Sequence, residues 1–450
     1  MALVKGKAMT LMTHRWTHAA AALAVGTLAV TTVTPAAADE TDKTIEGFLA
    51  DSTPYRFVVP EDWNGTVFVD LDFASGGPSE SQQALIDDGA AYGGTTRDVT
   101  GWNLRGAVDN QIEALDAFAA TAGVPSRAIA MGQSMGGMIA ATTGELHPDR
   151  IDGVVAGCGG LSGTVSQWNQ KLDTVFTLGQ LIDPTLPVVD IPDDIEAARA
   201  LWQGALAEAQ QSPEGRARIA LASAIGQLPA WSQSVEDPDP KDPRQYEAGW
   251  YGSLSGDPLP YIGQAMSSRK TSTEVFGGLP SWNVGIDYAE QLRKASAESR
   301  RVVKALYDEA GLSLKDDLAT VNGAERIEAD PDAVERFAAS YEFTGDISVP
   351  TLTLNAVGDQ ISTVAQQSAY EQRVNRAGNA PLLRQTYVGS AGHCAFSDAE
   401  VVTAANVLLD RLDTGHWGGS TAVHHLNAAA EALDMGEARF LNYRPDRFNR

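Results

Sequence analysis

The sequence predicts an α/β fold built on a mostly parallel sheet, with a large and mainly helical insertion. Apolar β-type runs alternate with helical runs over residues 65–160 and again from residue 349, and a long stretch rich in helical runs separates these parts. Strands that alternate with helices pair in parallel through right-handed crossovers. A glycine-flanked serine at 132–136, between a predicted strand and a predicted helix, is the third observation behind this assignment.

The elements of the first α/β part follow one another closely. They are a strand at 65–77, a helix and a strand at 81–97, a helix at 108–123, a strand, turn and helix at 127–150 and a buried strand at 151–160. Gly123 and Pro148 end two of these helices, as expected from residues that do not continue a helix. Two later strands, at 349–359 and 382–393, resume the pattern.

A different stretch separates the two α/β parts. We predict an α/β core formed by residues 39–165 and 346–450, and a helical cap formed by residues 166–345. The acidic, proline-rich segment 236–243 indicates a solvated loop, with calcium binding as the alternative.

The composition is that of a globular protein and excludes some partners. Of the 450 residues, 43% are hydrophobic and 20% are charged, and the formal net charge is −25. This sign of charge repels nucleic acids and anionic lipid surfaces. We therefore expect no nucleic-acid partner.

Residues 1–38 have the pattern of an export signal. Basic residues lie near an apolar, alanine-rich run at 19–33, and Ala36 and Ala38 provide a small-residue cleavage site. A membrane anchor is the alternative, but the apolar run is shorter than the roughly 20 residues that span a bilayer. We expect a secreted protein without a membrane anchor, cleaved near Ala38.

The pentapeptide Gly132-Gln133-Ser134-Met135-Gly136 fits the Gly-x-Ser-x-Gly pattern of a nucleophilic serine. A serine that presents its hydroxyl at the end of a sheet sits in a strained turn, and side chains two residues away on either side would collide there. The following helix directs free N–H groups and its dipole toward the site. Ser134 is therefore the candidate nucleophile.

A serine nucleophile needs a base, and the base needs a group that orients it. Of the histidines after residue 38, only His393 follows a late β-type run in a small-residue loop, although a buried structural histidine is the alternative. The others lie at a helix end or in a polar C-terminal segment; they are His147, His416, His424 and His425. Asp359 follows a predicted strand, and the order Ser134, Asp359, His393 suits nucleophile, acid and base.

The chain has two cysteines, Cys158 and Cys394, and the second stands beside His393. An oxidising compartment favours a disulfide between them. The alternative is two buried free cysteines that do not meet. Metal binding is disfavoured because no histidines stand at ligand spacing and one His-Cys pair offers too few ligands. We expect neither a metal nor a cofactor.

These motifs resemble those of the α/β-hydrolase superfamily. The resemblance covers roughly residues 50–165 and 346–415, and it implies an eight-stranded sheet with the cap inserted after the sixth strand. It also implies that Ser134 is the nucleophile, that His393 acts as general base and then acid, and that Asp359 orients the histidine.

The same resemblance implies an oxyanion hole. One donor would be the N–H of Met135, and the other an N–H in the loop after residues 66–72, which we assign to Ala74. Many relatives carry His-Gly in that loop, whereas this chain has Asp72-Phe73. An acidic side chain at this place is expected to affect the electrostatics of the site.

The cysteines are similar in placement to those of secreted tannases and feruloyl esterases, which tie a cysteine beside the nucleophile to one beside the histidine. His393-Cys394 matches the second half of this arrangement. Gln133 precedes the nucleophile instead of cysteine, so Cys158, after the next strand, takes the partner position.

These features predict a secreted serine esterase that cleaves carboxylic esters, from small molecules or polymers, through an acyl-enzyme. The alternatives are a serine exopeptidase of the prolyl-peptidase kind and a non-catalytic binding module. Gln133, Trp168 and Trp282 are candidate substrate-binding residues, although aromatic residues of a cap are mostly core. No cationic cluster in the sequence indicates an anionic substrate.

Overall fold

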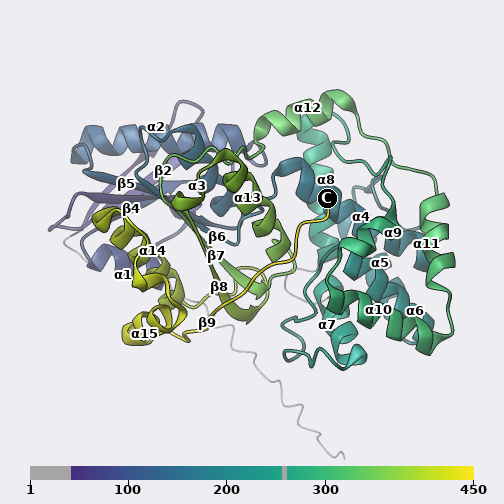
Figure 1. Ribbon diagram of the computed structural model, residues 1–450. Helices are drawn as coiled ribbons and strands as arrows, with labels where there is room; N and C mark the ends of the chain where they lie inside the picture. The colour runs from purple at the N-terminus through teal and green to yellow at the C-terminus, as the bar shows by residue number, and fades with distance from the viewer. Residues whose placement is uncertain (1–41, 256–260) are drawn as a thin grey trace, which may run out of the picture. The chain divides into compact units, whose positions relative to one another are not determined.

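The computed structural model describes residues 42–255 and 261–450 (Figure 1). The predicted export signal at 1–38 lies outside the described residues. The described part is a mixed α/β fold with nine strands and fifteen α-helices, so the predicted fold class is confirmed. Among these helices, none combines the length and the hydropathy that a membrane span requires.

All nine strands belong to one sheet, in the order β1-β2-β4-β3-β5-β6-β7-β8-β9. Their bounds are β1 (Lys43–Phe48), β2 (Pro54–Val59), β3 (Thr66–Leu71), β4 (Ala91–Thr95), β5 (Arg127–Gln133), β6 (Gly153–Gly157), β7 (Thr351–Gly358), β8 (Leu383–Ala391) and β9 (Phe440–Leu441). The pairings from β4 through β8 are parallel, and β1, β2 and β9 join antiparallel. The expected count of eight strands is wrong by one, because Phe440 and Leu441 pair with β8 at the sheet edge.

Helices cover both faces of the sheet (Figure 1). One face carries α2 (Leu104–Ala122), α3 (Met135–Leu146) and α13 (Val364–Ala377), and the other carries α1 (Glu80–Asp87), α14 (Asp398–Thr414) and α15 (Val423–Leu433). Side chains of a strand alternate between the two layers. On β3, Val67 and Val69 pack into the first layer, and Phe68 packs into the second. Because both faces are covered, the carboxyl ends of the strands remain as the place for a site.

The segment between β6 and β7 contains helices and connecting loops but no strand among its described residues, and we call it the cap. Its helices are α4 (Thr164–Ile182), α5 (Ile195–Ala209), α6 (Pro213–Ile225), α7 (Pro243–Ser255), α8 (Tyr261–Phe276), α9 (Tyr288–Lys294), α10 (Ala297–Ala310), α11 (Leu314–Gly323) and α12 (Pro331–Ser340). Buried residues of several of these helices, including Trp202 and Trp250, form a hydrophobic cluster of their own. The described chain nevertheless belongs to one compact unit, so the domain boundaries at 166 and 345 stay a prediction.

Candidate active site

Ser134 stands in the turn between β5 and α3, with φ 57° and ψ −120°. This backbone conformation is strained for a residue with a side chain. A Cβ on Gly132 would lie 2.6 Å from the carbonyl carbon of Gly136, so the turn closes only with glycine at this place. The N–H of Ser134 donates to the carbonyl of Gly157 at 3.0 Å, which ties the turn to the end of β6.

Three residues from distant parts of the sequence meet at this turn. His393 Nε2 lies 2.7 Å from Ser134 Oγ, and His393 Nδ1 lies 2.9 Å and 3.0 Å from the two carboxylate oxygens of Asp359. An ionised carboxylate only accepts hydrogen bonds, so Nδ1 carries the proton and Nε2 is left to accept from the serine hydroxyl. This tautomer is the one that can take a proton from Ser134.

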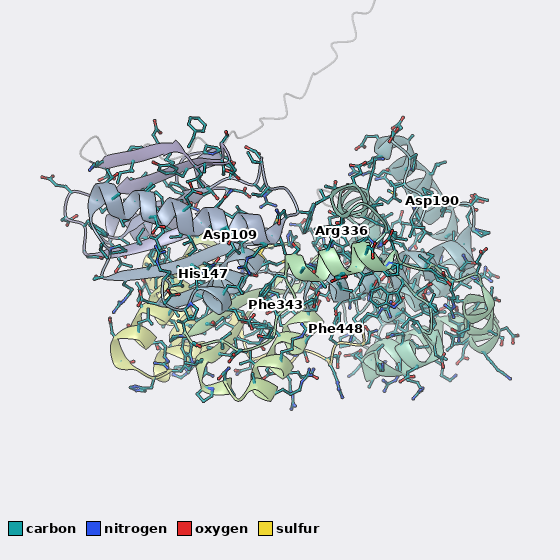
Figure 2. All side chains as sticks on the ribbon, turned by 90° about the horizontal axis from the view of Figure 1, so that it is seen from above. Asp109, His147, Asp190, Arg336, Phe343 and Phe448 are labelled. Atoms are coloured by element: carbon teal, nitrogen blue, oxygen red, sulfur yellow. A yellow bond between two sulfur atoms is a disulfide. The ribbon has the colours of Figure 1, made fainter. Side chains whose placement is uncertain are left out.

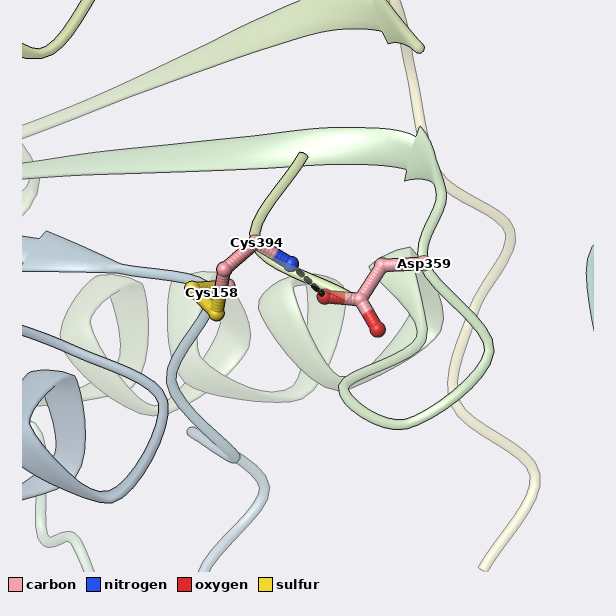
Figure 3. A group of neighbouring side chains, drawn as sticks. All are labelled: Cys158, Asp359 and Cys394. Atoms are coloured by element: carbon pink, nitrogen blue, oxygen red, sulfur yellow. Dashed lines mark hydrogen bonds between the residues drawn. A yellow bond between two sulfur atoms is a disulfide. The ribbon is translucent and has the colours of Figure 1, made fainter. Parts of the chain in front are cut away.

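The carboxylate of Asp359 is fully buried and is held from several directions. Its Oδ1 accepts from the N–H groups of Ile361 at 2.8 Å and Ser362 at 2.9 Å. Its Oδ2 accepts from the N–H of Cys394 at 3.4 Å, as Figure 3 shows. These bonds hold the carboxylate in its orientation toward His393.

The predicted disulfide between Cys158 and Cys394 is present, with the Cα atoms 5.3 Å apart (Figure 3). Cys158 follows β6, and its Sγ also lies 3.3 Å from the N–H of Ser134. The bond therefore connects the loop of His393 to the strand end beside Ser134. The sulfur atoms and a carboxylate oxygen of Asp359 lie within 4.8 Å of one another, but sulfurs bonded to each other are not thiolate ligands for a metal.

The predicted oxyanion donors lie at the starts of two helices. Met135 is the first residue of α3, and Ala74 lies in a short 3₁₀-helix, η1 (Phe73–Ser75), that follows β3. Asp72 precedes η1 and accepts from Nε of Arg97 at 2.7 Å. Nη1 of Arg97 lies 3.3 Å from Sδ of Met135. The acidic side chain noted in the sequence is therefore paired with a cation, and the donor roles stay a prediction.

No family model matches this chain. Over 430 residues it is 34% identical to the o-phthalyl amidase of Xanthobacter agilis, in an alignment that covers 88% of this chain and 93% of that relative. The chain belongs to the family of this amidase. Family membership makes the chain a hydrolase of the esterase or amidase kind.

Likenesses to solved structures are more distant than this amidase family relationship. Feruloyl esterase B from Aspergillus oryzae is 14% identical with a TM-score of 0.39, covering 83% of this chain and 80% of the esterase. The acylaminoacyl peptidase of Pyrococcus horikoshii is 9% identical with a TM-score of 0.38, covering 84% of this chain and 43% of the peptidase. At these TM-scores the likenesses decide nothing about activity.

In this member of the amidase family, the histidines other than His393 lie elsewhere. His147 ends α3, where its N–H donates to the carbonyl of Thr143 at 2.8 Å (Figure 2). The rings of His424 and His425 lie 4.0 Å apart at the start of α15. Within the described ranges, His393 is the histidine that contacts Ser134.

The predicted substrate-binding residues differ in exposure. Gln133 directly precedes Ser134 and is exposed. Trp168 is only 2% exposed and stands edge to face with Trp102, their ring centroids 5.5 Å apart. Trp282 is half-buried, with the guanidinium of Arg450 5.9 Å from its ring centroid. Substrate contact by these residues stays a prediction.

Two buried cationic side chains of the cap were not predicted from the sequence. Lys171 on α4 donates from Nζ to the carbonyl of Ile361 at 2.8 Å, and Arg269 on α8 donates from Nη2 to the carbonyl of Trp168 at 3.3 Å. Burial lowers the pKa of Lys171 to about 7, against the opposing charge of Asp359. Burial also lowers the pKa of Arg269 to about 10. Because α4 and α8 are far apart in the chain, only their packing reveals this pair.

A buried carboxyl group also lies against the turn that holds Ser134. Asp70 on β3 accepts from the hydroxyl of Tyr92 at 2.9 Å and from Nε2 of Gln82 at 3.1 Å. A Cβ on Gly132 would lie 2.9 Å from its Oδ1, so the carboxyl packs directly against the turn. Burial raises the pKa of Asp70 to about 7, which disfavours its charged form at neutral pH.

Proposed function

We propose that this chain is a serine hydrolase that cleaves an acyl amide or ester bond, with Ser134 as nucleophile, His393 as base and Asp359 as the orienting acid. The observation that carries the proposal is the continuous line of hydrogen bonds, 2.7 Å from Oγ to Nε2 and 2.9 Å from Nδ1 to the carboxylate. Both distances are within the reach that direct proton transfer and ring orientation require.

In the proposed reaction, Nε2 of His393 takes the hydroxyl proton while Oγ of Ser134 attacks the substrate carbonyl carbon. The tetrahedral intermediate collapses when the same imidazolium gives its proton to the leaving amine or alcohol, and an acyl-serine remains. Water then repeats the sequence and releases the acid. Asp359 stays ionised throughout and stabilises the imidazolium, for which its buried, hydrogen-bonded position is suited.

The oxyanion of the tetrahedral intermediate needs preorganised donors. We assign these to the N–H groups of Met135 and Ala74, at the start of α3 and in η1. The first N–H groups of a helix have no partner within the helix, and the α3 dipole favours negative charge at this end. The Arg97–Asp72 pair supports the assignment because it lies against both segments.

The relative's name supports an amide as the bond that is cleaved. A phthalyl group is a benzoyl group that carries a carboxylate in the position ortho to the acyl carbon. We propose that the substrate of this chain is an amide of an aromatic carboxylic acid. Ester cleavage, which the sequence favoured, uses the same triad chemistry and stays a prediction, as does the exopeptidase alternative.

A fluorophosphonate probe tests the nucleophile. The native chain is expected to be labelled and Ser134→Ala is not, whereas Ser126→Ala, at the opposite end of the same strand, keeps full labelling. Labelling of folded Ser134→Ala would refute the assignment. A panel of aroyl anilides, p-nitrophenyl esters and aminoacyl anilides then identifies the bond; turnover of aminoacyl anilides alone would favour the exopeptidase.

We also propose that the protein acts outside the cytoplasm. The Cys158–Cys394 disulfide supports this location, because disulfides persist mainly in oxidising compartments. Fractionation of the native host with N-terminal sequencing tests it. A protein outside the cytoplasm that begins near residue 39 is expected, and a reduced cytoplasmic protein that begins at Met1 would contradict the proposal.

A further inference from the structure

We infer that Lys171 and Arg269 form a subsite that binds a carboxylate on the aromatic acyl group of the substrate. The inference rests on the proposed function, because it concerns how the same site would bind the acyl group. It adds the residues that would distinguish an anionic aroyl group from a neutral one.

Lys171 has a buried amino group with unused donors. It is 1% exposed, and its one hydrogen bond within the described part goes to the carbonyl of Ile361. Its Nζ also lies 5.6 Å from the ring centroid of Trp168 and 4.8 Å from that of Tyr261. In its protonated form this group has three donors, and no described carboxylate forms an ion pair with it.

Arg269 has a buried guanidinium group, which also has hydrogen-bond donors without partners. It is 2% exposed, its Nη2 donates to the carbonyl of Trp168, and its Nη1 has no hydrogen-bond partner among the described residues. Nε1 of Trp168 is likewise buried without a partner in this part of the chain. Unused donors thus occur on three neighbouring residues, because Nζ of Lys171 lies 5.6 Å from the ring centroid of Trp168 and Arg269 binds the backbone carbonyl of Trp168.

The acidic groups nearest to these cations already have partners. Asp359 is bound by His393 and by backbone N–H groups. Asp173 lies 3.0 Å from Nε of Arg450 and accepts from the hydroxyl of Tyr288 at 3.0 Å. Buried charges with unsatisfied donors are unfavourable unless an anion completes them. A carboxylate has the charge and the acceptor geometry to do so.

The subsite lies beside the reacting groups. On α4, Nε2 of Gln167 lies 3.5 Å from Sδ of Met138, one turn beyond the nucleophile on α3. Four residues later on the same helix, Lys171 binds the carbonyl of Ile361, whose N–H binds Asp359. Helix α4 therefore contacts both the nucleophile helix and the turn of the catalytic acid, while α8 packs against α4 and contributes Arg269 (Figure 1).

The aromatic surroundings suit the ring that carries the carboxylate. Trp168 packs in a cluster with Phe276 and Phe337, and Trp102 stands against its edge. Flat aromatic side chains bind an aroyl ring through apolar contact and ring stacking. The combination of two cations and an indole selects an acyl group that is both aromatic and anionic.

The test compares 2-carboxybenzoyl anilide with benzoyl anilide. We expect the native chain to prefer the carboxylated substrate in kcat/KM. Lys171→Met and Arg269→Gln should each lower this preference by roughly 10- to 100-fold, the worth of a charge-assisted hydrogen bond. Lys270→Met is the matched control, because Lys270 follows Arg269 directly and binds Asp193 at 2.8 Å on the surface; its preference should equal that of the native chain.

The possible outcomes of this test distinguish failure of the subsite from failure of the proposed function. Equal losses on both substrates in variants that still react with the fluorophosphonate would show a structural role and overturn the inference. A native chain that cleaves benzoyl anilide without preference for the carboxylated form would overturn the inference and leave the proposed function standing. A native chain that neither cleaves an anilide or ester nor reacts with the probe would overturn the proposed function itself.

A binding measurement removes the dependence on turnover and on any single variant. Phthalate and benzoate are titrated by calorimetry into Ser134→Ala, and then into the same chain with Lys171→Met or Arg269→Gln. We expect phthalate to bind more tightly than benzoate and to lose this advantage in both double variants. Equal affinity of the two acids for Ser134→Ala would refute the subsite even if Lys171→Met does not fold.

Discussion

Replacing both Cys158 and Cys394 with alanine removes the bond that holds the His393 loop against the nucleophile turn. The two residues are 236 positions apart in the sequence, and cross-linking a loop of this length removes chain entropy worth about 5 kcal/mol at 25 °C from the unfolded state. Alanine keeps a small side chain at both positions, so little packing is lost with it. We expect the double variant to lose stability by about 2–5 kcal/mol, the range found when native disulfides are removed.

Activity should fall together with stability. Cys394 follows His393 directly, and its N–H donates to Asp359. A freed loop would hold the imidazole less firmly against Ser134, and kcat should decrease more than KM changes, because the loop positions the base and not the substrate.

Guanidinium denaturation monitored by circular dichroism measures the stability, and turnover of an activated ester measures kcat. Native protein incubated with dithiothreitol should match the double variant, which separates the effect of the bond from that of the substitutions. An unchanged denaturation midpoint together with an unchanged kcat would refute the reasoning. Two free thiols in denatured, unreduced native protein would refute the disulfide itself.

Three further predictions concern the surroundings of the site. Gly132→Ala places a Cβ 2.6 Å from a backbone carbon, so we expect a loss of about 1–3 kcal/mol in denaturation and a lower kcat, whereas Gly204→Ala, with open space around it, should cause neither. Burial raises the pKa of Asp70 from 3.8 to about 7, so its contribution to stability is full below pH 3.8 and is lost as the pH rises to about 7. In urea denaturation measured between pH 4 and pH 8, Asp70→Asn should remove this pH dependence of the free energy of unfolding, which is of the order of 4 kcal/mol. An unchanged pH profile in the variant would contradict the prediction. Arg439→Ala leaves the buried carboxylate of Glu400 without its cation and should destabilise by about 3–5 kcal/mol in the same assay; a loss below about 1 kcal/mol would contradict the assignment.

The parts of the site that local chemistry specifies could be predicted from the sequence. Ser134 was predicted because a strained turn was expected to exclude side chains at Gly132 and Gly136. The structure shows this exclusion at Gly132, whereas a Cβ on Gly136 would have its nearest neighbour at 3.5 Å, an ordinary contact. Asp359 and His393 were predicted because each follows an apolar strand, and parallel strands place their carboxyl ends at one edge. The distances that join the three residues agree with that expectation.

Other features depend on which segments pack together. The ninth strand has only two residues, Phe440 and Leu441, too few to form a periodic pattern. Lys171 and Arg269 could not be predicted as a pair, because nothing in the residues around each of them specifies that α4 and α8 bury both beside Trp168.

By itself, the sequence determined the α/β class, the three residues proposed as a triad and the pairing of the cysteines. These follow from short-range rules of backbone geometry, strand ends and thiol number. The tertiary structure alone decided the charge environment: the pairing of Asp72 with Arg97, the burial of Asp70 and the two unsatisfied cations of the cap. Electrostatic energies depend on burial and on distances between remote residues, and a linear pattern contains neither.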